Sequence, residues 1–261
     1  MTLHSPGTDA AAQAAAAFAA CSALYNGRTL SPSGSANLTN TSYAETLFTH
    51  AQQLYAFATN SSIPQVTYQT SVPSVADAYA SSGFYDELAI AALFMALAGN
   101  SSSDYAQATQ IYTQQNLAGH LQADAVFDWD EKTPGAAILG LQIANSYSYL
   151  ANTSSVNWKE DIESYLDRIV NDGSRAFLTP GKSTTDSAIT NITEEPEGGL
   201  LYYPGDSDEA TLNPALNAAM LLMHYAGDGL ASTADRQTSY VQFAQGQIDY
   251  AMGHITCISH V

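Results

Sequence analysis

Apolar residues recur along the chain at spacings of three and four residues, the periodicity of one face of an α-helix. The pattern predicts about eight helices, with expected bounds of 8–25, 43–59, 84–98, 103–116, 134–151, 157–172, 212–226 and 232–253. No segment has a convincing strand pattern. The sequence therefore predicts an all-α fold.

The predicted helices alternate in character. The first, third, fifth and seventh are apolar nearly all round, as in ELAIAALFMALAG, whereas the second, sixth and eighth have one polar face, as in WKEDIESYLDRIV. Helices of the first kind must be enclosed, and helices of the second kind enclose them. Short links follow the inner helices and long loops precede most of them. Repeated hairpins of this kind predict a toroid, with loops 60–83, 117–133 and 173–211 on one rim.

The net negative charge of the chain argues against anionic binding partners. Seven Lys and Arg residues stand against 25 Asp and Glu residues, which gives a net charge of −18. Such a chain repels phosphate backbones and anionic membranes, so we expect no nucleic-acid partner. The Ala-rich run 10–24 is interrupted by Gln13 and Ser22 and is shorter than the ~20 apolar residues of a bilayer span. It is expected to be a buried helix, and no membrane span is predicted.

The length of the chain and its two cysteines favour a single domain without a disulfide framework. A chain of 261 residues suits one large helical domain. Cys21 and Cys257 are too few for a disulfide framework or a zinc site built from cysteines, and Cys21 is expected in the core. The histidines contain no pair at helical spacing, so no metal site is predicted.

Six Asn-x-Ser/Thr sequons lie between the apolar segments, at Asn37, Asn40, Asn60, Asn100, Asn152 and Asn191. They favour a secreted, extracellular chain with glycosylated loops. The alternative is that a composition rich in Ser and Thr creates sequons by chance. The opening MTLHSPGTD has no basic region followed by an apolar one, so a signal peptide is absent from this chain.

The rim loops carry the candidate chemistry. In 127–135, FDWDEKTPG, Thr133 is the expected N-cap of a helix with Pro134 at its first position, which places Trp129 and Asp130 on the preceding loop. An indole face can stack on the C–H face of a sugar, and carboxylates can accept hydrogen bonds from hydroxyl groups. Loops 81–87 and 194–216 end in similar aromatic and acidic residues.

Each of these groups also has a structural interpretation. Asp86 and Glu87 fall in the first turn of a helix, where negative charge is stabilising without any ligand. Trp129 and Tyr202 could cover the end of the core, as large aromatic side chains often do. Lys132 is expected to neutralise its acidic neighbours rather than to catalyse. The residues alone leave both interpretations open.

Five blocks resemble glycoside hydrolase family 9, in the family's order and over nearly the whole chain: HSPGTDAAAQAAAAFAACSALY, SSGFYDELAIAALFMALAG, FDWDEKTPGA, PEGGLLYY and FAQGQIDYAMG. Members of this family are mostly cellulases, endoglucanases above all, built as a twelve-helix (α/α)6 barrel that cuts β-1,4-glucan with inversion. The resemblance implies that this chain supplies about eight of those helices, in agreement with the alternation.

The resemblance also implies a substrate-binding set. Trp129 is expected to stack on glucan, with Asp130 and Lys132 on the same wall, and Tyr85 and Asp86 match a cleft position that is often Trp-Asp. Tyr202, in PEGGLLYY, completes the set. No cofactor is required, a structural calcium ion is compatible with the family, and a monomer acting on β-glucan is expected.

The family's catalytic base comes from an Asp-x-Gly-Asp type motif, and its acid is a Glu near the C-terminus. Neither motif is found here, so no catalytic residue is assigned and the chain as given is expected to be inactive. We expect residues 1–253 to be part of a catalytic domain, residues 254–261 to be a tail outside the family, and the whole to be an internal fragment of an endoglucanase. The alternatives are a non-catalytic glucan-binding or scaffold protein on the same fold, or an unrelated (α/α)6 protein.

Overall fold

The computed structural model describes residues 2–30, 38–123, 125–151, 155–171, 176–178, 189–191 and 199–254. The chain forms two compact units. The first unit comprises Met1–Ala123 and Trp129–Lys159, and the second comprises Asp124–Asp128 and Glu160–Val261. No sequence signal marks this division.

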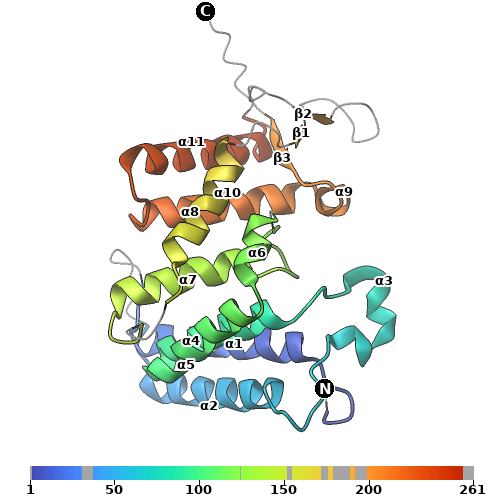
Figure 1. Cartoon of the computed structure of the whole chain (residues 1–261), viewed down its shortest axis with the longest axis vertical. Coiled ribbons are helices and arrows are strands. Elements are labelled where there is room, and N and C mark those ends of the chain that lie inside the picture. Colours follow the sequence, from blue (N-terminus) through green and yellow to red (C-terminus); the bar gives the residue numbers. More distant parts are fainter. Residues whose placement is uncertain are drawn as a thin grey trace, which may run out of the picture. The chain divides into compact units, whose positions relative to one another are not determined.

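The first unit contains α1 (Thr8–Tyr25), α2 (Thr41–Ala58), the short 3-10 helices η1 (Tyr68–Thr70) and η2 (Pro73–Val75), α3 (Ala76–Tyr79), α4 (Tyr85–Gly99), α5 (Ser102–Gln114), α6 (Leu117–Gln122), α7 (Thr133–Ser146) and the start of α8 (Trp158–Asn171) (Figure 1). The second unit contains the rest of α8, β1 (Ala176–Leu178), β2 (Ile189–Asn191), β3 (Leu200–Tyr202), α9 (Asp206–Ala210), α10 (Leu212–Gly227) and α11 (Ala234–Ala251). Every helix predicted from the sequence is therefore present.

Burial confirms the predicted alternation of inner and outer helices. Eleven of the fifteen residues of α4 are buried, against three of the eighteen residues of α11. In the first unit, α1 packs against α2 and α4, and α4 packs against α5 and α7; in the second, α10 packs against α11. The apolar helices thus form the core, and the amphipathic ones cover it.

The predicted helix 134–151 ends early, at Ser146. The next residue, Tyr147, leaves the helix and donates a hydrogen bond from its hydroxyl to the Thr29 carbonyl at 3.1 Å. The guanidinium of Arg28 lies over its ring, 4.5 Å from the centroid. These contacts with the segment that follows α1 are absent from the local sequence pattern, which explains the difference in the boundary.

A three-stranded antiparallel sheet in the order β2-β1-β3 lies in the second unit, so the prediction of no strands is wrong. Each strand has three residues, too few to show a two-residue period. Gln247 of α11 holds β3 from the side: its Oε1 accepts from Leu201 N at 2.6 Å, and its Nε2 donates to Gly199 O at 3.2 Å. A distant side chain thus adds two hydrogen bonds to a strand that is paired with β1.

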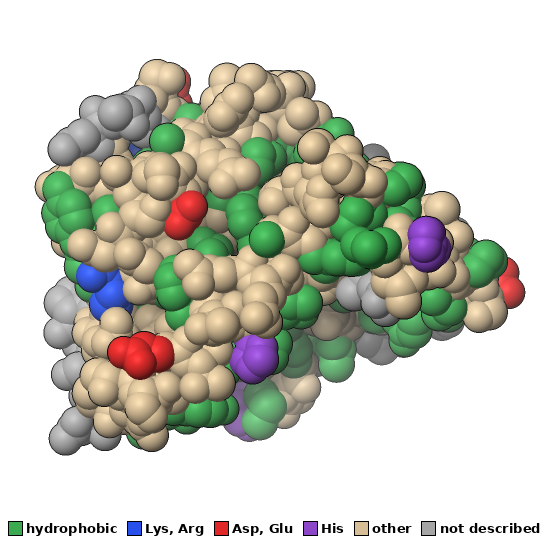
Figure 2. All heavy atoms as spheres, turned by 90° about the horizontal axis from the view of Figure 1, so that it is seen from below, with side chains coloured by type: hydrophobic (Ala, Val, Ile, Leu, Met, Phe, Trp, Pro, Cys, Tyr) green, Lys and Arg blue, Asp and Glu red, His purple; other side chains and the backbone are tan. Residues whose placement is uncertain are grey.

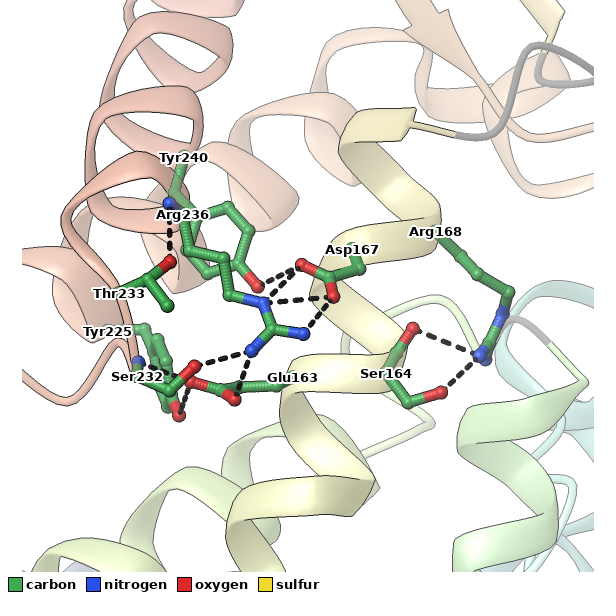
Figure 3. Close-up of polar contacts among 9 residues, drawn as sticks. All are labelled: Glu163, Ser164, Asp167, Arg168, Tyr225, Ser232, Thr233, Arg236 and Tyr240. Carbon is green, nitrogen blue, oxygen red and sulfur yellow. Dashed lines mark hydrogen bonds and ion pairs between the residues drawn. The ribbon is translucent and has the colours of Figure 1, made fainter.

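A partly buried polar network joins three helices of the second unit (Figure 3). Arg236 of α11 binds the Asp167 carboxylate through Nε and Nη2, the latter at 2.7 Å, and Nη1 lies 2.8 Å from Glu163 Oε2. Tyr240 donates to Asp167 at 2.6 Å, and Tyr225 of α10 donates to Glu163 at 3.3 Å. Because Glu163 and Asp167 lie one turn apart on α8, a single arginine can fasten α11 to α8.

The surface also corrects one expectation. Cys21 of α1 is exposed, so its predicted place in the core is wrong. On the face shown in Figure 2, apolar side chains lie among uncharged polar ones and charged groups are few, in keeping with a charged fraction of 12%. None of the helices among the described residues is long and apolar enough to cross a bilayer.

Candidate functional site

The first unit carries a groove of about 420 Å³, whose lining includes Asp9, Gln13, Tyr68, Tyr79, Ser81 and Trp129. Tyr79 and Trp129 are 60% and 44% exposed. Their rings meet edge to face, with centroids 5.5 Å apart and planes at 90°. We call this the aromatic groove. Its wall presents two large rings to solvent, which is an arrangement suited to a ring-shaped ligand.

Asp9 holds the backbone of Tyr68, another residue that lines the aromatic groove. Its carboxylate is buried at the start of α1 and accepts hydrogen bonds from Tyr68 N at 2.9 and 3.1 Å. Burial, and then the charges of Asp9 and Asp130, raise the pKa of the Tyr68 hydroxyl. This hydroxyl therefore keeps its proton, which it donates to the Tyr79 carbonyl. The aspartate thus holds both tyrosines through one short chain of contacts.

Two further carboxylates tie residues 129–132, here called the Trp129 loop, to the start of α4 and the segment before it. Asp86 Oδ2 accepts from Lys132 N at 2.6 Å, and both oxygens of Asp130 accept from Ser82 N, at 2.9 and 3.1 Å. The ends of the predicted loops 60–83 and 117–133 therefore meet in the first unit, in agreement with the prediction that Asp86 and Trp129 lie at the same end of the helices. Loop 173–211 belongs to the second unit, and most of it lies outside the described residues.

The helix behind the Trp129 loop starts differently from the expectation. Lys132 is the N-cap residue of α7, and Thr133 is the first helical residue, so the prediction of Thr133 as N-cap is wrong. The cap is supplied by Glu131, whose Oε1 accepts from Thr133 N at 2.8 Å while its Oε2 lies 2.8 Å from His120 Nδ1. A carboxylate at a helix N-terminus satisfies a free N–H group and the helix dipole together.

Glu87, beside Asp86 on α4, is 0% exposed. Its Oε1 accepts a hydrogen bond from Gln13 Nε2 at 2.9 Å, and the Asp86 carboxyl is its other side-chain hydrogen-bond partner. Burial, and then the Asp86 carboxyl, raise the pKa of Glu87 to about 9. The side chain is therefore a neutral acid at pH 7.

The predicted site residues divide into three groups. Trp129 and Tyr85, which is 37% exposed, present aromatic surface. Asp86, Asp130 and Lys132 lie beside them, although both carboxylates bind protein backbone and the Lys132 ammonium donates to the Trp129 carbonyl. Tyr202 is different: it lies in the second unit, is 3% exposed, and donates its hydroxyl to Asp208. It presents almost no surface to a ligand.

Sequence reasoning missed four residues of the aromatic groove: Asp9, Gln13, Tyr68 and Tyr79. The two tyrosines lie in loop 60–83, which was already placed on the rim, so aromatic residues in that loop were an available signal. Gln13 had no such signal, because a single polar residue within an Ala-rich helix is not distinctive. Within the described ranges, no three His, Cys, Asp or Glu side chains are placed to hold a metal ion.

Comparisons with known proteins agree with the helical architecture. Endoglucanase 15 of Arabidopsis thaliana is 28% identical over 257 residues, covering 95% of this chain and 44% of that protein. The structure of an endoglucanase from the termite Nasutitermes takasagoensis matches with a TM-score of 0.68 and 29% identity, over 96% of this chain and 46% of the other. The catalytic domain of Clostridium thermocellum CelT matches in fold, with a TM-score of 0.66 at 20% identity, over 98% of this chain and 46% of that domain.

This chain thus spans less than half the length of the relatives it matches. Its helices and these neighbours assign it the (α/α)6 toroid class. The sequence profile described as glycosyl hydrolase family 9 matches residues 1–259, which includes most of the segment 254–261 expected to lie outside the family. With the family's profile matching almost every residue, the chain belongs to glycosyl hydrolase family 9.

Proposed function

We propose that this chain is part of an endoglucanase-type glycoside hydrolase and binds β-1,4-glucan in the aromatic groove. The observation that carries the proposal is the exposed pair Tyr79 and Trp129, held in place by the Asp9, Asp86 and Asp130 carboxylates. A glucose ring offers a flat C–H face to such rings and hydroxyl groups to polar neighbours. The relatives named as endoglucanases support a cellulose-like substrate.

Hydrolysis with inversion needs a carboxylate base and a carboxylic acid about 6.5–9.5 Å apart, with room for a water molecule. The carboxylates of Asp9, Asp86 and Asp130 accept backbone hydrogen bonds, and Glu87 is enclosed. We therefore assign binding to this chain and no catalytic residue, and we expect the chain alone to be inactive. An inverting reaction in the whole protein would take its acid and base from other residues.

The test uses the 261-residue chain as it stands. Titration calorimetry with cellotetraose should show saturable binding, and a reducing-sugar assay on soluble β-glucan should show no release above background. A chain that is folded by circular dichroism but does not bind cellotetraose would refute the binding role. Release of sugar that scales with protein concentration would instead require a carboxylate pair within these residues, with Asp86 and Asp130 tested first.

A second candidate is a non-catalytic glucan-binding or scaffold protein of the same fold. It is favoured by the engagement of the groove carboxylates with backbone N–H groups. The encoding locus separates the two candidates. Flanking coding sequence with an Asp-x-Gly-Asp motif upstream and a glutamate block downstream supports the enzyme, and its absence supports the binding protein.

We also propose that the protein is secreted, glycosylated and monomeric. Asn40, Asn60 and Asn100 are exposed, and the side-chain oxygen of each accepts a hydrogen bond, from Tyr43 N, Ser62 N and Arg28 respectively. These contacts leave the amide nitrogen, which is the atom that carries a glycan, pointing to no partner within the described residues. Expression in a eukaryotic secretory host should give a product that loses mass on treatment with an N-glycosidase. Asn37 and Asn152 lie outside the described residues.

A further inference from the structure

Glu87 has an unusual environment for an acidic side chain. It is fully enclosed, one oxygen accepts a hydrogen bond from Gln13, and its other side-chain hydrogen-bond partner is a second acid, Asp86. A carboxylate in such a place would lack the donors that compensate a buried charge. The geometry therefore favours the neutral acid, which needs less compensation.

The charged and polar groups around Glu87 come from three elements of the first unit. Asp86 precedes it on α4, Gln13 approaches from α1, and Lys132 approaches from the Trp129 loop. Burial contributes most to the raised pKa of Glu87, and Asp86 adds to it, whereas Gln13 and Lys132 act in the opposite direction. The balance keeps the proton on Glu87 at neutral pH.

Gln13 connects this buried acid to the aromatic groove. Its Nε2 donates to Glu87 Oε1 at 2.9 Å and also lies 3.4 Å from the carbonyl oxygen of Trp129. The Lys132 ammonium donates to that same carbonyl. Two donors therefore converge on the backbone of Trp129, and Glu87 orients one of them. Without an acceptor at Glu87, the Gln13 amide could rotate away from the Trp129 loop.

We propose that Glu87 is a positioning residue for the aromatic groove: it orients the Gln13 amide, which with Lys132 fixes the Trp129 carbonyl and so sets the place of the indole on the wall. Glu87 itself is enclosed and does not meet a ligand. The glucan part of this inference rests on the proposed function, whereas the position of the indole is independent of it.

The first experiment compares Glu87→Gln, which keeps an acceptor for Gln13, with Glu87→Leu, which removes it at similar volume. Acrylamide quenching of tryptophan fluorescence reports on Trp129, because Trp158 is only 3% exposed. Glu87→Gln should match the parent chain. Glu87→Leu should show stronger quenching and a cellotetraose affinity about two- to tenfold weaker. Glu45→Leu, the same change at an exposed site on α2, is the control and should alter neither measurement.

A second experiment uses Gln13→Leu, which removes the amide that Glu87 orients and leaves Glu87 itself unchanged. This variant should show the stronger quenching expected of Glu87→Leu, because the Trp129 carbonyl loses the same donor. Combining the two substitutions should raise quenching no further.

The inference is overturned if folded Glu87→Leu retains the parent's quenching and affinity, or if folded Gln13→Leu retains the parent's quenching. Should Glu87→Leu fail to fold, Gln13→Leu decides alone. If no protein binds cellotetraose, the proposed function fails, but the quenching data still decide the positioning role.

Discussion

Trp158 and Gly140 lie in contact because the glycine has no side chain: a Cβ atom built on Gly140 would be 2.6 Å from Trp158 Cε2. The indole nitrogen of Trp158 donates to the Tyr105 hydroxyl at 2.8 Å, and this hydroxyl donates to the Gly140 carbonyl at 3.0 Å. The start of α8 is thereby locked onto α7 and α5 within the first unit.

Gly140→Ala should lower the free energy of unfolding by about 1–3 kcal/mol, the usual cost of overpacking a filled core. Urea unfolding followed by circular dichroism measures the change. Gly246→Ala is the matched control, because that glycine lies within α11 with no atom near its Cβ position. It should be neutral or stabilising by up to about 1 kcal/mol. Equal effects of the two substitutions would contradict the packing argument.

Arg236→Ala should be strongly destabilising, because it leaves Glu163 and Asp167 without their shared cation. Breaking a buried pair from one side costs about 3–5 kcal/mol, and the partial exposure of the arginine argues for the lower end. Thermal unfolding provides the measurement. Arg168→Ala, which removes a half-buried arginine bonded to Ser164 one turn away on α8, should cost less than about 1 kcal/mol. Equal unfolding temperatures for Arg236→Ala and Arg168→Ala would contradict a stabilising role for the network.

The stability of the chain should depend on pH through Glu87. Its pKa rises from 4.5 to about 9 on folding, so its stabilising contribution is complete below the lower value and is lost as the pH rises toward the upper one. The parent chain should therefore lose stability relative to Glu87→Gln between these limits. Unfolding titrations at several pH values test this, and a constant difference between the two proteins would contradict a buried neutral acid.

Trp129→Ala should weaken cellotetraose binding by about 0.5–1.5 kcal/mol, the range measured for aromatic contacts. Titration calorimetry on the chain gives the affinity. Tyr43→Ala removes a ring that is similarly exposed, at 46%, but lies on α2 outside the lining of the aromatic groove. It should leave the affinity unchanged, and a parallel loss in both variants would point to non-specific binding.

The helices could be predicted from the sequence because their signal is local: each apolar face and many of the caps lie within one segment. The exposure of Cys21 could not, because an Ala-rich helix has no polar stripe to show which side faces solvent. The strands could not be predicted either, because the contacts that stabilise them are not local in the sequence. These contacts come from the neighbouring strands and, for β3, also from Gln247, which lies 46 residues after Leu201.

The candidate site was predictable in part. Trp129, Asp130, Asp86 and Lys132 stand out as a cluster, and the structure brings them together. What their side chains bind was not predictable, because Asp130 and Asp86 reach backbone N–H groups 48 and 46 residues away along the chain. Tyr202 looked similar in sequence but is buried.

The side-chain amide of Gln247 has a consequence for the behaviour of the chain in concentrated solution. Among the described strands β3 lies at the edge of the sheet, and the outer edge of such a strand can recruit a strand from another molecule and seed aggregation. Gln247 occupies the Leu201 N–H and the Gly199 carbonyl, so these two groups cannot offer a template for such growth. The side chain of one glutamine thus protects this edge of the sheet from pairing with a strand of another molecule.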